Sequence, residues 1–159
     1  MDIADQFLKT KKFKQKNYGK MVQIQKKLFD VWALNRFKEE GYPDMQIGYI
    51  GFLMNIDEDG ITNKEMAEKV HVTKQAMSKA IKELERLNIV VTKPHESDAR
   101  MSMIHLTDLG KKLVVTMVKN LKEKTKEYES LVGKEKFHEA LDTMYEVMMY
   151  EKEKMWKVK

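Results

Sequence analysis

Residues 62–110 carry two helical patterns followed by two strand patterns, an order that few folds accommodate. Thr62 stands three residues before Glu65, the spacing of a capping box, and predicts that a helix begins there. Thr73 is a natural N-cap and predicts a second helix. The apolar residues of that second helix recur every three or four positions: Met77, Ala80, Ile81, Leu84 and Leu87. Such a stripe must face a core.

The opposite face of the second helix carries amide, hydroxyl and cationic groups: Gln75, Ser78, Lys79, Lys82 and Arg86, with Lys74 at the edge of the first turn. Donors gathered near the N-terminal end are typical of a helix that enters the major groove of DNA. For an isolated helix we would prefer to interpret them as a solvated surface. The capped helix before it and the strands after it favour the groove-binding interpretation.

The two strand patterns predict a β-hairpin with a charged tip. Residues 89–92 are all β-branched, Pro94 suits the end or the edge of a strand, and residues 95–100 form a polar turn cluster. Residues 101–107 return as a second strand, after which Thr107 is expected to cap a further helix that has Gly110 in its first turn. A hairpin beside a helix pair can reach a phosphate backbone or a minor groove.

This stretch resembles the MarR family (multiple antibiotic resistance regulators), which are winged-helix transcription factors. The resemblance rests on Ala67, Val70, Ser78, Leu84, Asp98, Arg100, Leu106, Thr107 and Gly110. It implies that Asp98 braces Arg100 and that Arg100 lies at or in a minor groove, where negative potential attracts arginine. An ion pair within the hairpin that has no part in DNA binding is the alternative interpretation.

The chain departs from the family pattern in two places. Asn88 stands where the family often has a glycine to close the recognition helix, although asparagine tolerates the left-handed conformation. The hairpin offers only Thr92 and Lys93 where a run of arginines is common. We therefore expect a weaker backbone anchor, or one supplied by Lys93, His95 or the N-terminus.

The charge of the chain is unevenly distributed. The 159 residues have a formal net charge of +5, a mild bias toward polyanions. From Lys9 to Lys27 there are lysines but no acidic residue: Lys9, Lys11, Lys12, Lys14, Lys16, Lys20, Lys26 and Lys27. Before Met21 this segment has no clean apolar stripe, so we expect a solvated or phosphate-contacting arm and no membrane attachment. The absence of cysteine excludes disulfides and thiol redox switching.

Outside residues 62–110 the pattern is helical. A first long helix is expected to reach about Glu40, and Asp44 is expected to cap the next one. Within that second helix Gly48 and Gly51 are unusual, and they indicate either close helix packing or room for a ligand. Long amphipathic helices on both sides of a small module need a partner surface, which a homodimer supplies. The expected parts are an N-terminal dimerisation helix (1–42), a winged helix-turn-helix DNA-binding domain (43–110) and C-terminal dimerisation helices (111–159).

The sequence gives little support to other classes of protein. It has no phosphate loop, no nucleophile motif and no histidine spacing typical of a zinc site, so we expect no enzyme, no cofactor and no structural metal. The family resemblance leaves open a regulatory metal site that the fold assembles in space. The chain has no long apolar run and no signal peptide, so a soluble, cytoplasmic protein is expected.

These observations predict a mainly α fold with a small β-hairpin wing. The predicted function is sequence-specific binding of double-stranded DNA by a homodimeric repressor that recognises a pseudo-palindromic operator. The alternative is a winged helix that contacts protein and binds no specific DNA. The predicted DNA-binding residues are Thr62, Lys64, Thr73, Lys74, Gln75, Ser78, Lys79, Lys82, Lys93, Asp98 and Arg100. By resemblance, a small aromatic or lipophilic anionic effector releases the DNA, and the residues suited to hold it are Phe29, Trp32, Arg36, Tyr49 and Phe52. Ordinary core packing of these aromatic residues is the alternative.

Overall fold

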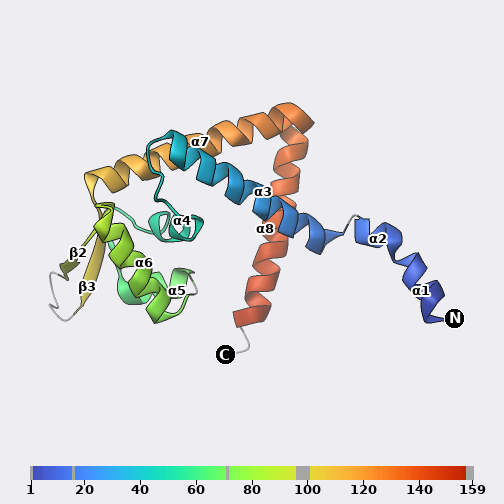
Figure 1. Cartoon of the computed structure of the whole chain (residues 1–159), viewed down its shortest axis with the longest axis horizontal. Coiled ribbons are helices and arrows are strands. Elements are labelled where there is room, and N and C mark those ends of the chain that lie inside the picture. The colour runs from blue at the N-terminus through green and yellow to red at the C-terminus, as the bar shows by residue number, and fades with distance from the viewer. Residues whose placement is uncertain (1, 16, 71, 96–100, 157–159) are drawn as a thin grey trace. The chain divides into compact units, whose positions relative to one another are not determined.

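The computed structural model describes residues 2–15, 17–70, 72–95 and 101–156, without the side chains of Lys12 and Trp156. This part of the chain is mostly helical and has one small sheet (Figure 1). The helices are α1 (Ile3–Lys9), α2 (Lys11–Gln15), α3 (Tyr18–Glu39), α4 (Ile47–Leu53), α5 (Asn63–Val70), α6 (Lys74–Arg86), α7 (Asp108–Val132) and α8 (Lys134–Trp156). The chain divides into two compact units, residues 1–110 and 111–159.

The sheet of the first unit contains three antiparallel strands in the order β1-β3-β2: β1 (Ile61–Thr62), β2 (Val90–Pro94) and β3 (Ser102–Leu106). The predicted hairpin is confirmed as β2 and β3, with Val90 opposite Leu106. A third strand that the sequence did not predict, β1, adds to the free edge of β3 with Ile61 opposite Ile104. A two-residue strand has no recognisable alternation, and only its distant partner defines it.

The core of the first unit lies where α4, α5 and α6 meet the sheet. Its most completely buried side chains are Leu53, Met66, Leu84, Ile89 and Ile104. The predicted stripe of α6 is confirmed, since all its members are buried except the half-buried Leu87. Truncation of a side chain such as Leu84 to alanine would cost about 2–5 kcal/mol. This packing fixes which face of α6 remains outside.

The helices before residue 62 differ from expectation in two places. The single N-terminal helix is instead three, and α3 begins at an N-cap, Asn17, whose Oδ1 accepts a hydrogen bond from the backbone N–H of Lys20 at 3.0 Å. Asp44 is not a cap, because α4 starts at Ile47 and has Gln46 at its N-cap without a side-chain hydrogen bond. An asparagine cap satisfies a backbone N–H at a helix start, and this favours a new helix at residue 18.

The second unit is formed by α7 from residue 111 and by α8. Gly133 separates these helices with φ +91°, a conformation that favours glycine. Across this turn the rings of Tyr128 and Phe137 lie 5.7 Å apart, and Nε2 of His138 lies 2.7 Å from Oε1 of Glu129. No helix in the described ranges is long and apolar enough to cross a membrane.

Candidate nucleic-acid interface

A capping box at the start of α5 orients this helix relative to the sheet. Oε2 of Glu65 accepts hydrogen bonds from the backbone N–H of Thr62 at 3.0 Å and from its hydroxyl at 2.8 Å, and the N–H of Glu65 donates to Oγ1 of Thr62 at 3.2 Å. The backbone hydrogen bond from Thr62 lowers the pKa of the Glu65 carboxyl, with a further contribution from its hydroxyl. The predicted capping box is therefore confirmed. Since Thr62 belongs to β1, it joins the sheet to α5.

The N-terminus of α6 is suited to bind an anion. Oγ1 of Thr73 accepts a hydrogen bond from the backbone N–H of Ala76 at 3.2 Å, which confirms the predicted N-cap. The first turn of α6 contains no acidic residue and begins with Lys74. The helix dipole and the free N–H groups of a first turn favour negative charge, and a lysine there adds to the effect.

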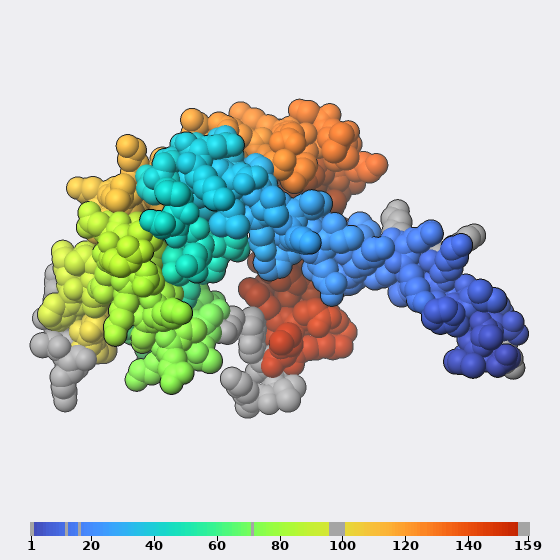
Figure 2. All heavy atoms as spheres, viewed as in Figure 1, coloured from blue at the N-terminus to red at the C-terminus, as the bar shows by residue number. Residues whose placement is uncertain are grey.

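The helix α6 lies at the surface of the view in Figure 2 (yellow-green), and the side chains of its outer face are polar and mostly exposed. A shallow open hollow of about 530 Å³ runs along it, lined by Lys74, Gln75, Ser78, Lys79, Lys82 and Glu83. The one carboxylate in this set, Glu83, accepts a hydrogen bond from Nε of Arg86 at 2.9 Å. The pairing raises the pKa of the Arg86 guanidinium and offsets the negative charge. The hollow thus combines three ammonium groups with an amide and a hydroxyl, which suits an anionic surface that carries hydrogen-bonding edges.

The turn after α6 connects the recognition helix to the wing. Asn88 adopts a φ of 56°, so it fills the glycine-like role that the sequence predicted for it. Its carbonyl accepts a hydrogen bond from the hydroxyl of Thr107 at 2.6 Å, and the carbonyl of the next residue, Ile89, accepts one from the backbone N–H of Thr107 at 3.0 Å. Oγ1 of Thr107 also caps α7 by accepting from the N–H of Gly110 at 3.0 Å. One threonine therefore ties the end of α6, the end of β3 and the start of α7 together.

A second link between α6 and the wing was not foreseen. Oε1 of Glu85 accepts a hydrogen bond from the backbone N–H of Thr92 at 3.2 Å. Because β2 is an edge strand, this N–H has no strand partner on its outer side. The sequence offered no signal for the contact, since seven residues separate the two partners and they belong to different elements. The link fixes the base of the wing to the recognition helix.

The remaining predicted DNA-binding residues are placed as follows. Lys64 and Lys93 are exposed, at the start of α5 and on β2. The Thr62 side chain is engaged with Glu65 in the capping box. Asp98 and Arg100 lie outside the described residues. Residue 94 ends β2 as expected of a proline, and the hairpin extends one residue further through a hydrogen bond of 2.8 Å from the N–H of His95 to the carbonyl of Met101.

The residues predicted to hold an effector fall into two groups. Phe29 and Trp32 are half-buried on α3, with ring centroids 5.3 Å apart. The guanidinium of Arg36 lies 3.0 Å from Glu39 and 3.4 Å from Glu40, so carboxylates of its own helix already pair with it. Tyr49 and Phe52 on α4 are buried core residues, and burial raises the pKa of the Tyr49 phenol.

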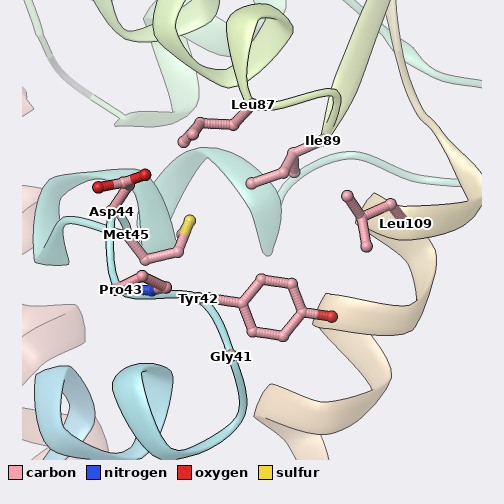
Figure 3. Close-up of a pocket in the computed structure, with 8 residues that line it drawn as sticks. All are labelled: Gly41, Tyr42, Pro43, Asp44, Met45, Leu87, Ile89 and Leu109. Carbon is pink, nitrogen blue, oxygen red and sulfur yellow. The ribbon is translucent and has the colours of Figure 1, made fainter.

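A different cavity, of about 210 Å³, lies between the α3–α4 loop and the end of α6 (Figure 3). Its wall consists of Gly41, Tyr42, Pro43, Asp44, Met45, Leu87, Ile89 and Leu109. The ring of Tyr42 and the side chains of Met45, Ile89 and Leu109 point toward one another across it. Ligand sites usually measure about 300–1,000 Å³, so this cavity suits a small ring at most. Its mostly apolar wall includes both neighbours of Asn88, at the point where α6 ends.

Metal-ligand groups do not come together in the part of the chain that the structure describes. Among those residues no group of three or more histidine or acidic side chains is arranged to hold a metal ion. His95 lies on the wing. His105 is on β3, and its imidazole packs so close to Gly60 that a Cβ added to that glycine would lie 2.7 Å from the ring.

The fold and this surface define a winged helix-turn-helix protein. Residues 40–101, which include α4, α5, α6 and the strands β1 and β2, match the sequence model of the MarR family. This central part of the chain is therefore similar to the MarR family. A relative, the transcriptional regulator AdcR of Streptococcus pneumoniae serotype 2 (strain D39 / NCTC 7466), is 37% identical over 59 residues, which make up 37% of this chain and 40% of AdcR. The alignment thus spans less than half the length of that relative.

Solved structures share the fold over nearly their whole length. A MarR transcriptional regulator from Methanosarcina mazei Go1 is 24% identical with a TM-score of 0.72, and the match covers 86% of this chain and 96% of that one. MepR from S. aureus, in a complex with DNA, is 20% identical with a TM-score of 0.69, covering 85% of this chain and 98% of MepR. At these identities the similarity establishes the architecture.

Proposed function

We propose that this protein is a transcriptional regulator that recognises a specific sequence of double-stranded DNA with α6. The observation that carries the proposal is the outer face of α6, where an amide, a hydroxyl and three ammonium groups line one surface beside an acid-free helix N-terminus. The match of residues 40–101 to the MarR family and the shared fold with MepR, which was solved in a complex with DNA, support it.

The side chains divide by the kind of DNA contact they suit. Gln75, Ser78 and Lys79 lie on the first two turns of α6, and with Lys82 they are assigned to base edges in the major groove. Phosphates are assigned to Lys74, to Lys64 and to the hydroxyl of Thr73, whose oxygen caps the helix while its proton remains available to donate. The wing would add Lys93 and Arg100, the latter braced by Asp98. This division predicts two distinct classes of mutant.

The protein is also proposed to act as a homodimer. Apolar side chains of α3 are widely exposed, among them Met21, Ile24, Leu28 and Val31. The same holds for Leu141, Met144, Tyr145 and Met148 on α8. Soluble monomers rarely expose this much contiguous apolar surface, so a second copy is the simplest cover. Two recognition helices about 34–36 Å apart would then meet successive major grooves of a pseudo-palindrome.

Repression relieved by a small effector is the proposed mode of regulation. The effector would be a small aromatic or lipophilic anion held by Phe29, Trp32 and Arg36, with Tyr49 and Phe52 nearby. A salicylate titration monitored by tryptophan fluorescence tests this, with Trp32→Phe to locate the response. An unchanged signal and unchanged DNA affinity with salicylate and with simple phenols would remove the effector and leave the DNA-binding dimer.

Selection of bound fragments from the source genome tests the function itself. The protein should enrich fragments that share one motif with dyad symmetry, and binding should weaken steeply with salt. Enrichment without a shared motif would favour the alternative, a winged helix that contacts protein. Sedimentation at micromolar concentration tests the dimer separately, and a well-folded monomer would contradict it.

A further inference from the structure

The N-terminal arm, which comprises α1 and α2, presents an exposed apolar face. Ile3, Phe7 and Leu8 are 75%, 64% and 72% exposed, and α1 contains no buried residue. With Ala4 these residues occupy less than half of the circumference of α1, because a helix has about 3.6 residues per turn. A helix of two turns is marginally stable in water, so a surface that covered this face would also stabilise the helix.

The break between α1 and α2 explains why the sequence concealed this face. Thr10 ends α1, where its hydroxyl donates to the carbonyl of Phe7 at 2.6 Å, and α2 begins at Lys11. In one continuous helix Phe13 would lie about 120° around the axis from Phe7, and no single stripe would result. The expectation of no membrane attachment rested on the absence of such a stripe before Met21. Two short helices remove that reason.

The arm also carries more positive charge than the chain as a whole. Residues 1–27 contain eight lysines and two aspartates, a net charge of +6, whereas all 159 residues have +5. Both aspartates, Asp2 and Asp5, lie in the first five residues, so residues 6–27 contain no acidic side chain. The bias of this chain toward polyanions is therefore located in its N-terminal segment.

A hollow beside the apolar face brings the two kinds of side chain together. It measures about 320 Å³ and is lined by Phe7, Leu8, Lys11, Lys14, Gln15 and Lys20, none of which is acidic. Nζ of Lys14 stands 3.7 Å above the Phe7 ring, and Nζ of Lys20 donates to the carbonyl of Lys14 at 3.3 Å. The surface that fits this hollow has negative charge directly beside apolar groups.

We propose that the N-terminal arm binds the surface of an anionic lipid bilayer. Ile3, Phe7 and Leu8 enter the boundary of the acyl chains, and the lysines lie at the lipid phosphates, as in other amphipathic helices that lie in a membrane interface. A cluster of about four to eight lysines on such a segment adds attraction to acidic lipids. DNA would attract the lysines but leave the apolar side chains in water, whereas a bilayer accommodates both. The inference goes beyond the proposed DNA recognition and does not depend on it.

Co-sedimentation of the full chain with lipid vesicles tests the proposal. The wild type should bind vesicles that mix phosphatidylserine with phosphatidylcholine at least about tenfold more tightly than vesicles of phosphatidylcholine alone. Phe7→Ser with Leu8→Ser, and separately Lys11→Gln with Lys14→Gln, should each weaken binding to the mixed vesicles at least about tenfold. All four positions are exposed, so the fold should be retained. A wild type that does not bind the mixed vesicles would overturn the proposal.

Two matched controls accompany these variants. Phe7→Leu with Leu8→Phe keeps the composition of the apolar face and should bind the mixed vesicles as the wild type does. Lys134→Gln with Lys136→Gln removes an equal charge from exposed positions at the start of α8 and should also leave binding unchanged. If this second control weakened binding as much as the change at Lys11 and Lys14, overall charge would explain the binding and the arm would have no special part in it.

A fluorescent label tests whether the apolar face enters the bilayer. Because the chain has no cysteine, Leu8→Cys provides a single site for a label that is sensitive to polarity. Its emission should shift to shorter wavelength when the mixed vesicles are added. Gln6→Cys, on the opposite side of α1, is the matched control and should respond much less. Equal responses at the two positions would contradict insertion of this face.

The same variants distinguish the other partners. If Lys11→Gln with Lys14→Gln weakens binding to double-stranded DNA of mixed sequence while the wild type ignores the vesicles, the arm contacts DNA and the proposal is wrong. If Phe7→Ser with Leu8→Ser changes the sedimentation of the chain without lipid, a second copy covers the face and the proposal is again wrong. A wild type that binds the mixed vesicles but selects no DNA motif would support this inference and refute only the proposed function.

Discussion

A methyl group added at Gly110 would strike the backbone that joins the recognition helix to the wing. An ideal Cβ there lies 2.0 Å from the carbonyl oxygen of Ile89 and 3.2 Å from Cδ2 of Leu106. Real Cβ atoms essentially never approach closer than 3.0 Å, so the Ile89 carbonyl must retreat by at least 1 Å. That oxygen accepts the backbone N–H of Thr107 at 3.0 Å and lies 3.1 Å from its hydroxyl.

The magnitude follows from these contacts. A retreat of that size lengthens both hydrogen bonds beyond useful range, and their loss costs about 1–3 kcal/mol. Overpacking against backbone adds about 1–3 kcal/mol. The higher helix propensity of alanine stabilises the folded chain by only about 1 kcal/mol relative to glycine. We therefore expect Gly110→Ala to lower the free energy of unfolding by about 1–5 kcal/mol.

Gly48 and Gly51 supply matched controls, because both are helical glycines where an added Cβ would meet nothing within 4 Å. The same substitution at either should stabilise the chain by about 0.5–1 kcal/mol. Urea unfolding at one protein concentration measures all three variants, since the stability of a dimer depends on concentration. A Gly110→Ala variant as stable as the wild type would refute the reasoning. Marked destabilisation at Gly48 would show that another surface covers that face of α4.

Three further predictions concern the same unit. Hydrogen bonds with Thr62 lower the pKa of the Glu65 carboxyl in the folded state, so the carboxylate stabilises the fold fully above the ordinary pKa of 4.5 and ceases to do so as pH falls through the folded pKa. In an acid titration of stability, Glu65→Gln should lack this loss of stability, and a pH profile identical to that of the wild type would count against the capping box. Glu85→Ala should lower stability by about 0.5–1 kcal/mol in urea unfolding, because the edge N–H of Thr92 then has only water, and a more stable variant would contradict the link. Arg100→Ala should weaken DNA binding in fluorescence anisotropy with little change in melting temperature, whereas wild-type affinity would leave the arginine no role at the minor groove.

Local patterns made α6 and its surroundings predictable. Each helix end that was correctly predicted rests on a short-range signal: a threonine cap at Thr73, the Thr62–Glu65 spacing, or a left-handed residue at Asn88. The polar face of α6 followed from the same reasoning, because the buried stripe determines what remains outside. Prediction and structure agree where the signal lies within a single helix and its caps.

Contacts between distant elements were not predictable. The two residues of β1 become a strand only beside β3, and the Glu85–Thr92 hydrogen bond needs the fold to bring its partners together. The start of α3 could have been predicted from Asn17, because asparagine is a favoured N-cap residue, although it stands in a segment rich in lysine. The pairing of Arg36 with Glu39 and Glu40 was also readable, since partners three and four positions apart face each other on a helix.

The central claim is that α6 reads base edges. Repeating the genomic fragment selection with Gln75→Ala and, separately, with Lys74→Ala tests it most directly. Loss of the Gln75 amide should relax the preference at one position in each half-site and cost about 1–3 kcal/mol on the wild-type motif. Loss of the Lys74 ammonium should weaken binding to all sequences alike and leave the motif intact. An identical motif from Gln75→Ala and from variants at Ser78 and Lys79 would contradict the account, because sequence would then be read by another part of the protein.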